Sequence, residues 1–117
     1  KLTQEMSKLG PKLVMLTDGA NGAYAYDCRD GKNDLYFMRP YPDPKPPVDR
    51  TGAGDAFAST FTSAIALGKS VEEALCWAPI NSMSVVQYVG AQKGLLTRKQ
   101  LEEFLAKAPA DYKPEKI

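Results

Sequence analysis

The stretch VDRTGAGDAF, residues 48–57, brings the smallest side chains and a carboxylate together where an apolar helical pattern begins. Glycine lets backbone approach a ligand closely, and the first turn of a helix presents unpaired N–H groups at the positive end of its dipole. Gly52, Ala53 and Gly54 would therefore offer amide donors to a phosphate-like anion. Asp55 follows at once, where a carboxylate can accept a proton from an attacking hydroxyl. The spacing alone leaves open an ordinary turn in which Asp55 only caps the helix.

Three short strands are expected before this stretch. Residues 12–17, 23–28 and 35–40 are rich in strand-forming residues, and the turn sequences DGANG and RDGKND separate them. The first of them, KLVMLT, is an unbroken apolar run, which is typical of a strand buried on both faces. Residues 41–48, YPDPKPPV, contain four prolines and predict an irregular loop between the strands and the helices.

Three longer helices are expected around and after this loop, at residues 52–68, 70–88 and 97–106. The second and third begin with capping boxes, in which Ser70 precedes Glu73 and Thr97 precedes Gln100. Pro79 lies inside the second pattern and predicts a kink there.

The two ends of the chain carry weaker patterns. Leu2, Met6 and Leu9 recur at helical spacing and predict a short helix that stops before the Gly10–Pro11 pair. Residues 108–117, APADYKPEKI, are expected to be a polar tail.

Composition excludes several classes of function. The 117 residues have a formal net charge of +1 without a Lys/Arg block, so neither nucleic acid nor an anionic membrane is expected as a partner. We see no apolar run long enough to span a membrane and no signal peptide. Cys28 and Cys76 are expected to be two reduced, buried thiols of a cytoplasmic protein. Because histidine is absent, Ser-His and Cys-His nucleophiles and most zinc sites are excluded.

A few strands followed by helices indicate part of an α/β layer fold. A doubly wound sheet alternates strands with helices, whereas this chain has its strands only in the first third. Two or three strands make a small sheet for three long helices, so we expect an N-terminal part of the same fold to be missing. The apolar sheet surface left uncovered would favour self-association into a homo-oligomer.

The segment DRTGAGDAF is similar to the C-terminal signature of the ribokinase-like carbohydrate kinase family, also called the PfkB family. Asp49, Thr51, Gly54, Asp55 and Ala56 are among the residues that fit its pattern. LTDGANGAYAY resembles the nucleotide-binding strand–turn–strand of that family, and VGAQKG resembles a Gly-Ala loop that follows its second long helix.

The resemblance implies the C-terminal part of a Rossmann-type three-layer α/β fold, over residues 1–117, in an ATP-dependent kinase that phosphorylates a sugar hydroxyl. Asp55 would be the catalytic base, and the amides of Gly52, Ala53 and Gly54 would form the anion hole. ATP, with Mg²⁺, would bind at the Thr-x-Gly-x-x-Gly turn, for which the expected contacts are Thr17, Gly19 and Gly22.

Two further contacts are left open by the same resemblance. Asn81 could face the adenine or simply face solvent. A monovalent cation, usually potassium, could bind beside the anion hole, with its expected ligands contributed by Asp49, Thr51, Val85, Tyr88 and Gly90. Gly94 stands where ribokinase carries a serine ligand, which leaves the cation site in question.

The substrate is also open at this stage. The family's sugar-binding residues, its lid strands and its Asn-x-x-Glu motif belong to the N-terminal part, so these residues do not select an acceptor. A ribokinase- or fructokinase-type sugar kinase is the first hypothesis, and a nucleoside kinase is the alternative. A hypothesis of another class is a non-catalytic nucleotide-binding or assembly module.

Overall fold

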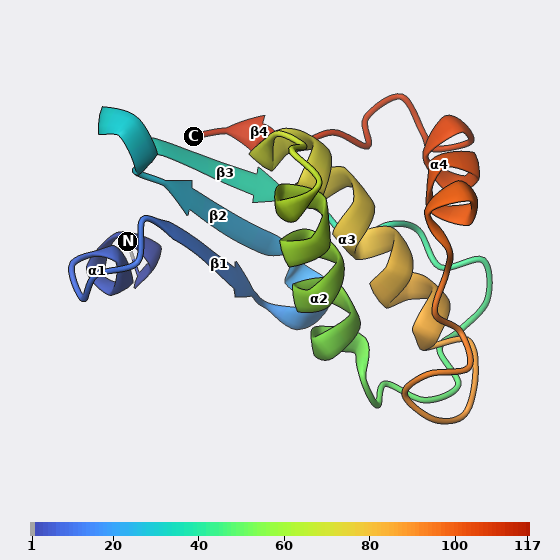
Figure 1. Ribbon diagram of the computed structural model, residues 1–117. Helices are drawn as coiled ribbons and strands as arrows, with labels where there is room; N and C mark the ends of the chain where they lie inside the picture. Colours follow the sequence, from blue (N-terminus) through green and yellow to red (C-terminus); the bar gives the residue numbers. More distant parts are fainter. Residues whose placement is uncertain (1) are drawn as a thin grey trace.

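A four-stranded antiparallel sheet, in the order β1-β2-β3-β4, supports the other elements in the computed structural model of the chain (Figure 1). The structure describes residues 2–117. The strands are β1 (Leu13–Thr17), β2 (Ala23–Asp27), β3 (Asp34–Met38) and β4 (Glu115–Lys116). The helices are α1 (Leu2–Ser7), α2 (Ala53–Ala66), α3 (Val71–Val85) and α4 (Arg98–Ala106).

The first three strands are joined by tight turns at the two glycine-containing sequences that predict them. Thr17 pairs with Ala23 across the first turn, and Asp27 pairs with Asp34 across the second. Each turn contains a short 3₁₀ segment, Gly19–Asn21 in the first and Arg29–Gly31 in the second. These three strands and their order along the chain therefore agree with the sequence prediction.

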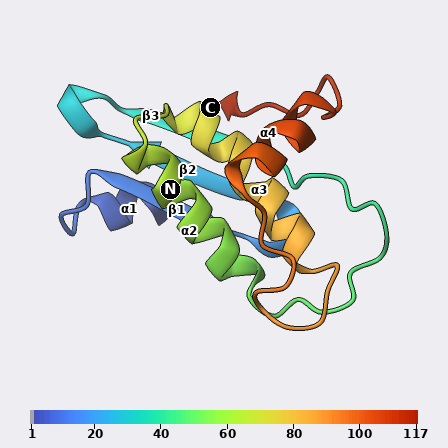
Figure 2. The same ribbon diagram turned by 45° about the vertical axis from the view of Figure 1, so that its right-hand side comes forward.

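One face of the sheet carries the main core. Ala23, Ala25, Tyr36 and Met38 point to the side that α2 and α3 cover, and all four are buried. The two helices cross in front of the sheet and pack against each other along their length (Figures 1 and 2). Small alanines on β2 let the helices approach closely, because short side chains on a pleated face leave room for larger ones opposite.

The other face of the sheet is only partly covered. Helix α1 packs against β1 and β2, while Tyr24 remains 36% exposed and packs at a tilt against Phe37, with ring centroids 5.2 Å apart. The expectation that residues 12–17 are buried on both faces is wrong. Only Val14 of β1 is buried, because β1 is an edge strand of the sheet and α1 covers just part of its outer face.

Helix α1 also differs from its prediction in the face that it buries. Leu2, Met6 and Leu9 are exposed, and Thr3 is the buried residue of this helix. The apolar spacing identifies a helix correctly, but its contact with the sheet is made through another side.

Both predicted capping boxes are present. Ser70 accepts from the amide of Glu73, and Thr97 accepts from the amide of Gln100, so α3 and α4 begin where these residues predict. Helix α3 ends at Val85, earlier than residue 88, and it continues through Pro79 without interruption.

The C-terminal residues correct the expectation of a polar tail. Tyr112 is buried at 6% exposure and belongs to the main core, and β4 adds a strand to the edge of β3. Lysines, prolines and acidic residues around Tyr112 give the segment a polar composition, although its one aromatic ring anchors it.

Cys28 and Cys76 are both free, as expected, and each is half-buried rather than fully buried. Within residues 2–117 we find no helix with the length and apolarity that crossing a membrane requires.

Candidate active site

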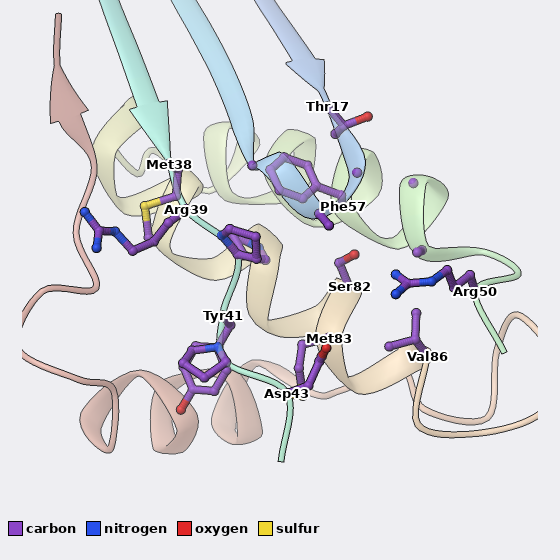
Figure 3. A pocket seen from close by; sticks show the side chains of 18 residues that line it. Thr17, Met38, Arg39, Tyr41, Asp43, Arg50, Phe57, Ser82, Met83 and Val86 are labelled. Carbon is purple, nitrogen blue, oxygen red and sulfur yellow. The ribbon is translucent and has the colours of Figure 1, made fainter. Parts of the chain in front are cut away.

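A cavity of about 450 Å³ lies between the β1–β2 turn, the segment after β3, the start of α2 and one face of α3 (Figure 3). It brings together segments that are far apart in the sequence. Its lining residues are Thr17, Gly19, Ala20, Gly22, residues 38–43, Arg50, Ala53, Gly54, Phe57, Pro79, Ser82, Met83 and Val86.

The β1–β2 turn contributes three of the four residues that the sequence assigns to nucleotide binding. Thr17, Gly19 and Gly22 line the cavity, and the turn is closed by the amide of Asp18, which donates to the Gly22 carbonyl over 2.8 Å. Gly22 has a φ of 112°, and a Cβ there would lie 2.5 Å from the Met38 carbonyl oxygen. No other residue type fits at position 22, so this glycine is required by the turn itself.

The start of α2 forms the opposite wall. Gly52 precedes the helix with a left-handed φ of 82°, and a Cβ added there would lie 2.7 Å from the Cβ of Ala91. Gly54, by contrast, has open space where a side chain would be, and it lines the cavity. The amides of Gly52, Gly54 and Asp55 donate to no acceptor within residues 2–117, whereas the Ala53 amide donates to Arg50 over 3.3 Å. These free donors beside a cavity are suited to an anion.

We expect Gly52 and Gly54 to fail in different ways when substituted. Gly52→Ala should lower the free energy of unfolding by about 2–4 kcal/mol, because it adds left-handed strain and a clash with Ala91. Gly54→Val should change stability by about 1 kcal/mol or less but fill space beside the free amides, and so weaken the binding of a phosphate ligand. Urea unfolding and calorimetric titration with ATP measure the two effects. If Gly54→Val and the unsubstituted chain have equal ATP affinity, residues 52–54 form only a turn and do not bind phosphate.

Asp55 lies in the first turn of α2, one residue after Gly54, which lines the cavity. Its side chain is exposed, and it makes no hydrogen bond or ion pair within the described residues 2–117. It is therefore available to an incoming group rather than engaged in capping α2, whose N-cap is Gly52.

Asp49 joins the turn before α2 to the loop after α3. One carboxylate oxygen accepts from the Thr51 amide and the other from the Gly90 amide, each over 2.9 Å. These bonds hold the pKa of Asp49 at about 2, with the Gly90 amide as the largest cause. The backbone amides of Val48 and Asp49 both donate to the Val86 carbonyl, which strengthens the same junction.

Three of the residues expected to bind a monovalent cation meet at this junction. Asp49, Thr51 and Gly90 are joined by hydrogen bonds, and the Tyr88 amide donates weakly to the Val85 carbonyl over 3.4 Å. The set offers one carboxylate and several backbone carbonyls, which are oxygen ligands of the kind that hard cations take.

Gly94 adds no ligand to this set. A Cβ at this position would lie 2.5 Å from the Ser84 carbonyl oxygen and 2.8 Å from Val85 Cα, so the loop packs too closely for a side chain. Ser84 instead donates its hydroxyl to the Gly94 carbonyl over 2.7 Å. Gly94 therefore lacks the side-chain oxygen that the serine-containing pattern supplies.

Asn81 is neither at the cavity nor in solvent, which corrects its prediction as an ATP contact. It is 6% exposed, donates to the Thr60 hydroxyl over 2.8 Å and accepts from the Leu96 amide over 2.9 Å. Both ends of its amide are used, so Asn81 ties α3 to α2 and to the loop before α4.

Sequence reasoning missed two walls of the cavity. Pro79, Ser82 and Met83 share one face of α3, and Val86 follows directly after the helix; this spacing could have identified them once Pro79 was placed at a site. No sequence pattern indicates that residues 39–43 line a site, because the position of this segment depends on contacts with distant parts of the chain.

The two arginines of the cavity differ in their partners. Arg39 is paired with Asp111 and Glu115, and its guanidinium turns away toward β4. Arg50 makes no ion pair within residues 2–117, and its guanidinium extends over the cavity (Figure 3).

Comparison with known proteins identifies this arrangement. The model of the pfkB family carbohydrate kinases matches residues 1–98. The chain belongs to this family. Ribokinase of Bacillus subtilis (strain 168), one member, is 48% identical over 103 residues, which cover 87% of this chain and 33% of that protein. The predicted family is therefore confirmed, and the chain spans about a third of the length of this curated relative.

Solved structures of the pfkB-type relatives agree with the fold. Arabidopsis thaliana ribokinase, solved in complex with ribose and ATP, superposes with a TM-score of 0.76 at 32% identity, over 87% of this chain and 31% of that one. The nucleoside kinase of Methanocaldococcus jannaschii gives a TM-score of 0.73 at 27% identity, over 82% of this chain and 30% of that one. The chain thus has part of a ribokinase-like α/β fold, as its sequence predicts.

Proposed function

We propose that this chain supplies the nucleotide site and the phosphoryl-transfer groups of an ATP-dependent sugar kinase. The observation that carries the proposal is the cavity that joins the Thr17–Gly22 turn to the free amides at the start of α2. A nucleotide in this cavity would direct its phosphates toward Gly54, where the helix dipole and the unpaired amides favour negative charge.

Asp55 is proposed as the general base. An alcohol is far too weak an acid for a carboxylate to ionise it outright, so the proton would move to Asp55 as the phosphoryl group is transferred. The amides of Gly52 and Gly54 would stabilise the charge that develops on the phosphoryl oxygens. Positioning and charge stabilisation then supply most of the lowering of the barrier.

Mg²⁺ is proposed to arrive with the nucleotide. Within residues 2–117 no group of three metal-binding side chains is present. Mg²⁺ commonly binds through substrate phosphates and keeps several waters, and it would supply further charge neutralisation there.

Arg50 is proposed to contact the nucleotide phosphates. Arg50→Gln should weaken ATP affinity about three- to tenfold, because an exposed charge-assisted hydrogen bond contributes on the order of 1 kcal/mol. Arg98→Gln is the matched control, since Arg98 is exposed and its charge lies on α4. Calorimetric titration with ATP at fixed ionic strength measures both. If the Arg50 and Arg98 variants have equal affinity for ATP, Arg50 does not contact the nucleotide phosphates.

Potassium is proposed to bind at the Asp49–Gly90 junction, where its charge would add to the field of the anion hole. Replacing tetramethylammonium by potassium at constant ionic strength should raise the melting temperature by a few degrees, about the shift that a ligand tenfold above its Kd produces. Asp49→Asn should remove this response. Calorimetric melting curves of both proteins measure it. A flat response in the unsubstituted chain would leave Asp49 as a structural link only.

A sugar is proposed as the acceptor because the identity with Bacillus subtilis ribokinase reaches 48%. The alternative, a nucleoside acceptor, is favoured by the likeness to the M. jannaschii nucleoside kinase. ATP-to-ADP conversion tests both, using a kinase in which this chain replaces the matching third of the B. subtilis ribokinase and a panel of pentoses, hexoses and nucleosides. ATP binding without transfer to any acceptor would favour the non-catalytic module.

A further inference from the structure

The segment of residues 39–43, called here the cavity wall, has little support from its own backbone. It follows β3 and contains Pro40 and Pro42, which have no N–H to donate. Apart from the hydrogen bonds within helices and between strands, no backbone–backbone hydrogen bond in residues 2–117 involves residues 39–47. Its position must therefore be set by side chains.

Those side chains lead to the C-terminal segment, residues 107–117, and to the end of α4. Arg39 pairs with Asp111 over 2.9 Å and with Glu115 over 2.7 Å. Its Nε is buried and has no acceptor among the described residues, so the two ion pairs are the polar contacts that hold this guanidinium. Figure 3 shows Arg39 turned toward β4, and not into the cavity.

Tyr41 is held from the same side. Its hydroxyl donates to the Phe104 carbonyl over 3.0 Å, and its ring packs edge-on against Tyr112 with centroids 5.0 Å apart. Tyr112 is in turn fixed by burial and by a hydrogen bond from its hydroxyl to the Cys76 carbonyl on α3. The wall is thus connected through Tyr112 to α3, which also contributes residues to the cavity lining.

We infer that the C-terminal segment positions the cavity wall and thereby sets the affinity of the cavity for a nucleotide. Asp111, Tyr112 and Glu115 do not line the cavity, so they are positioning residues that act through Arg39 and Tyr41. The inference rests on the proposed function, because a nucleotide is the ligand whose binding it describes. It also gives a role to a segment whose composition predicts only a polar tail.

The energies favour a positional role over a role in stability. Asp111 and Glu115 are well exposed, and exposed ion pairs contribute little to the free energy of folding. A ligand that needs an ordered wall nevertheless has an affinity proportional to the fraction of molecules in which the wall is ordered, so it binds more weakly as that fraction falls. Small changes at these pairs can therefore alter affinity without altering the melting temperature.

The test removes the ion pairs and leaves the cavity lining unchanged. Tyr112→Ala would delete a buried ring and destabilise the chain, so the double variant Asp111→Asn/Glu115→Gln is preferable. The control is Glu102→Gln, which removes a comparable exposed ion pair, with Arg98 on α4, and neither residue lines the cavity or contacts Arg39. Calorimetric titration with ATP gives the affinity, and ¹⁵N relaxation gives the order parameters of Arg39, Tyr41 and Asp43.

In the double variant, we expect ATP affinity to fall about three- to tenfold, with lower order parameters in the wall and little change in melting temperature. The control should match the unsubstituted chain in all three measurements. If the double variant binds ATP as tightly as the unsubstituted chain, the inference is wrong and the proposed function stands. If the unsubstituted chain binds neither ATP nor ADP, the proposed function fails and the inference fails with it.

Discussion

Asp55→Asn should lower phosphoryl transfer about 10²- to 10⁴-fold, the loss typical of a general base, while ATP affinity stays within about a few-fold. The amide keeps the size of the side chain but cannot accept the acceptor hydroxyl's proton. Asp55 makes no hydrogen bond or ion pair within residues 2–117, so its substitution should disturb neither α2 nor the cavity. The assay is steady-state turnover by the kinase in which this chain replaces the matching third of B. subtilis ribokinase.

Asp30→Asn provides the control for Asp55→Asn. Asp30 is an exposed carboxylate in the β2–β3 turn, and its φ of 55° is one that asparagine tolerates well. The control should therefore keep normal turnover while losing the same charge. Near-normal turnover in Asp55→Asn would rule out the general-base assignment and leave Asp55 with only a local role in the first turn of α2.

The parts of the site that could be predicted from sequence are those set by local chemistry. Gly22 and Gly52 have positive φ values and close neighbours, so glycine is needed there and its position in the sequence is informative. The capping boxes at Ser70 and Thr97 are equally local and fix where two helices begin. Composition and periodicity then suffice for the order of β1, β2, β3 and the helices α1 to α4 along the chain, but not for β4.

The parts that sequence did not predict depend on distant contacts. Asn81 has the same type and spacing whether it faces a ligand or the core, and its partners, Thr60 and Leu96, decide the outcome. Tyr112 is a single aromatic ring among polar residues, so no periodicity indicates that it is buried. At Gly54 no positive φ is needed, and the open space beside it is what matters.

The purified 117-residue chain should transfer no phosphate to any sugar or nucleoside, although we expect it to bind ATP weakly. Its proposed base is exposed, and the cavity beside the free amides is lined by the residues proposed for the nucleotide. An acceptor hydroxyl would not be held in line with the phosphoryl group, and water would compete with the acceptor for that group. Conversion of ATP to ADP against the panel of acceptors measures this directly.

Self-association should accompany the lack of turnover. Tyr24 and Phe37 lie on the partly covered face of the sheet, and β1 has an unpaired edge within residues 2–117. Such surfaces favour association, which sedimentation velocity would detect as a concentration-dependent increase in mass. Adding the N-terminal two thirds of B. subtilis ribokinase should restore sugar-dependent turnover, because the added part would hold the acceptor opposite Asp55. Robust turnover by the 117-residue chain alone would contradict this prediction, since it would mean that these residues already hold an acceptor.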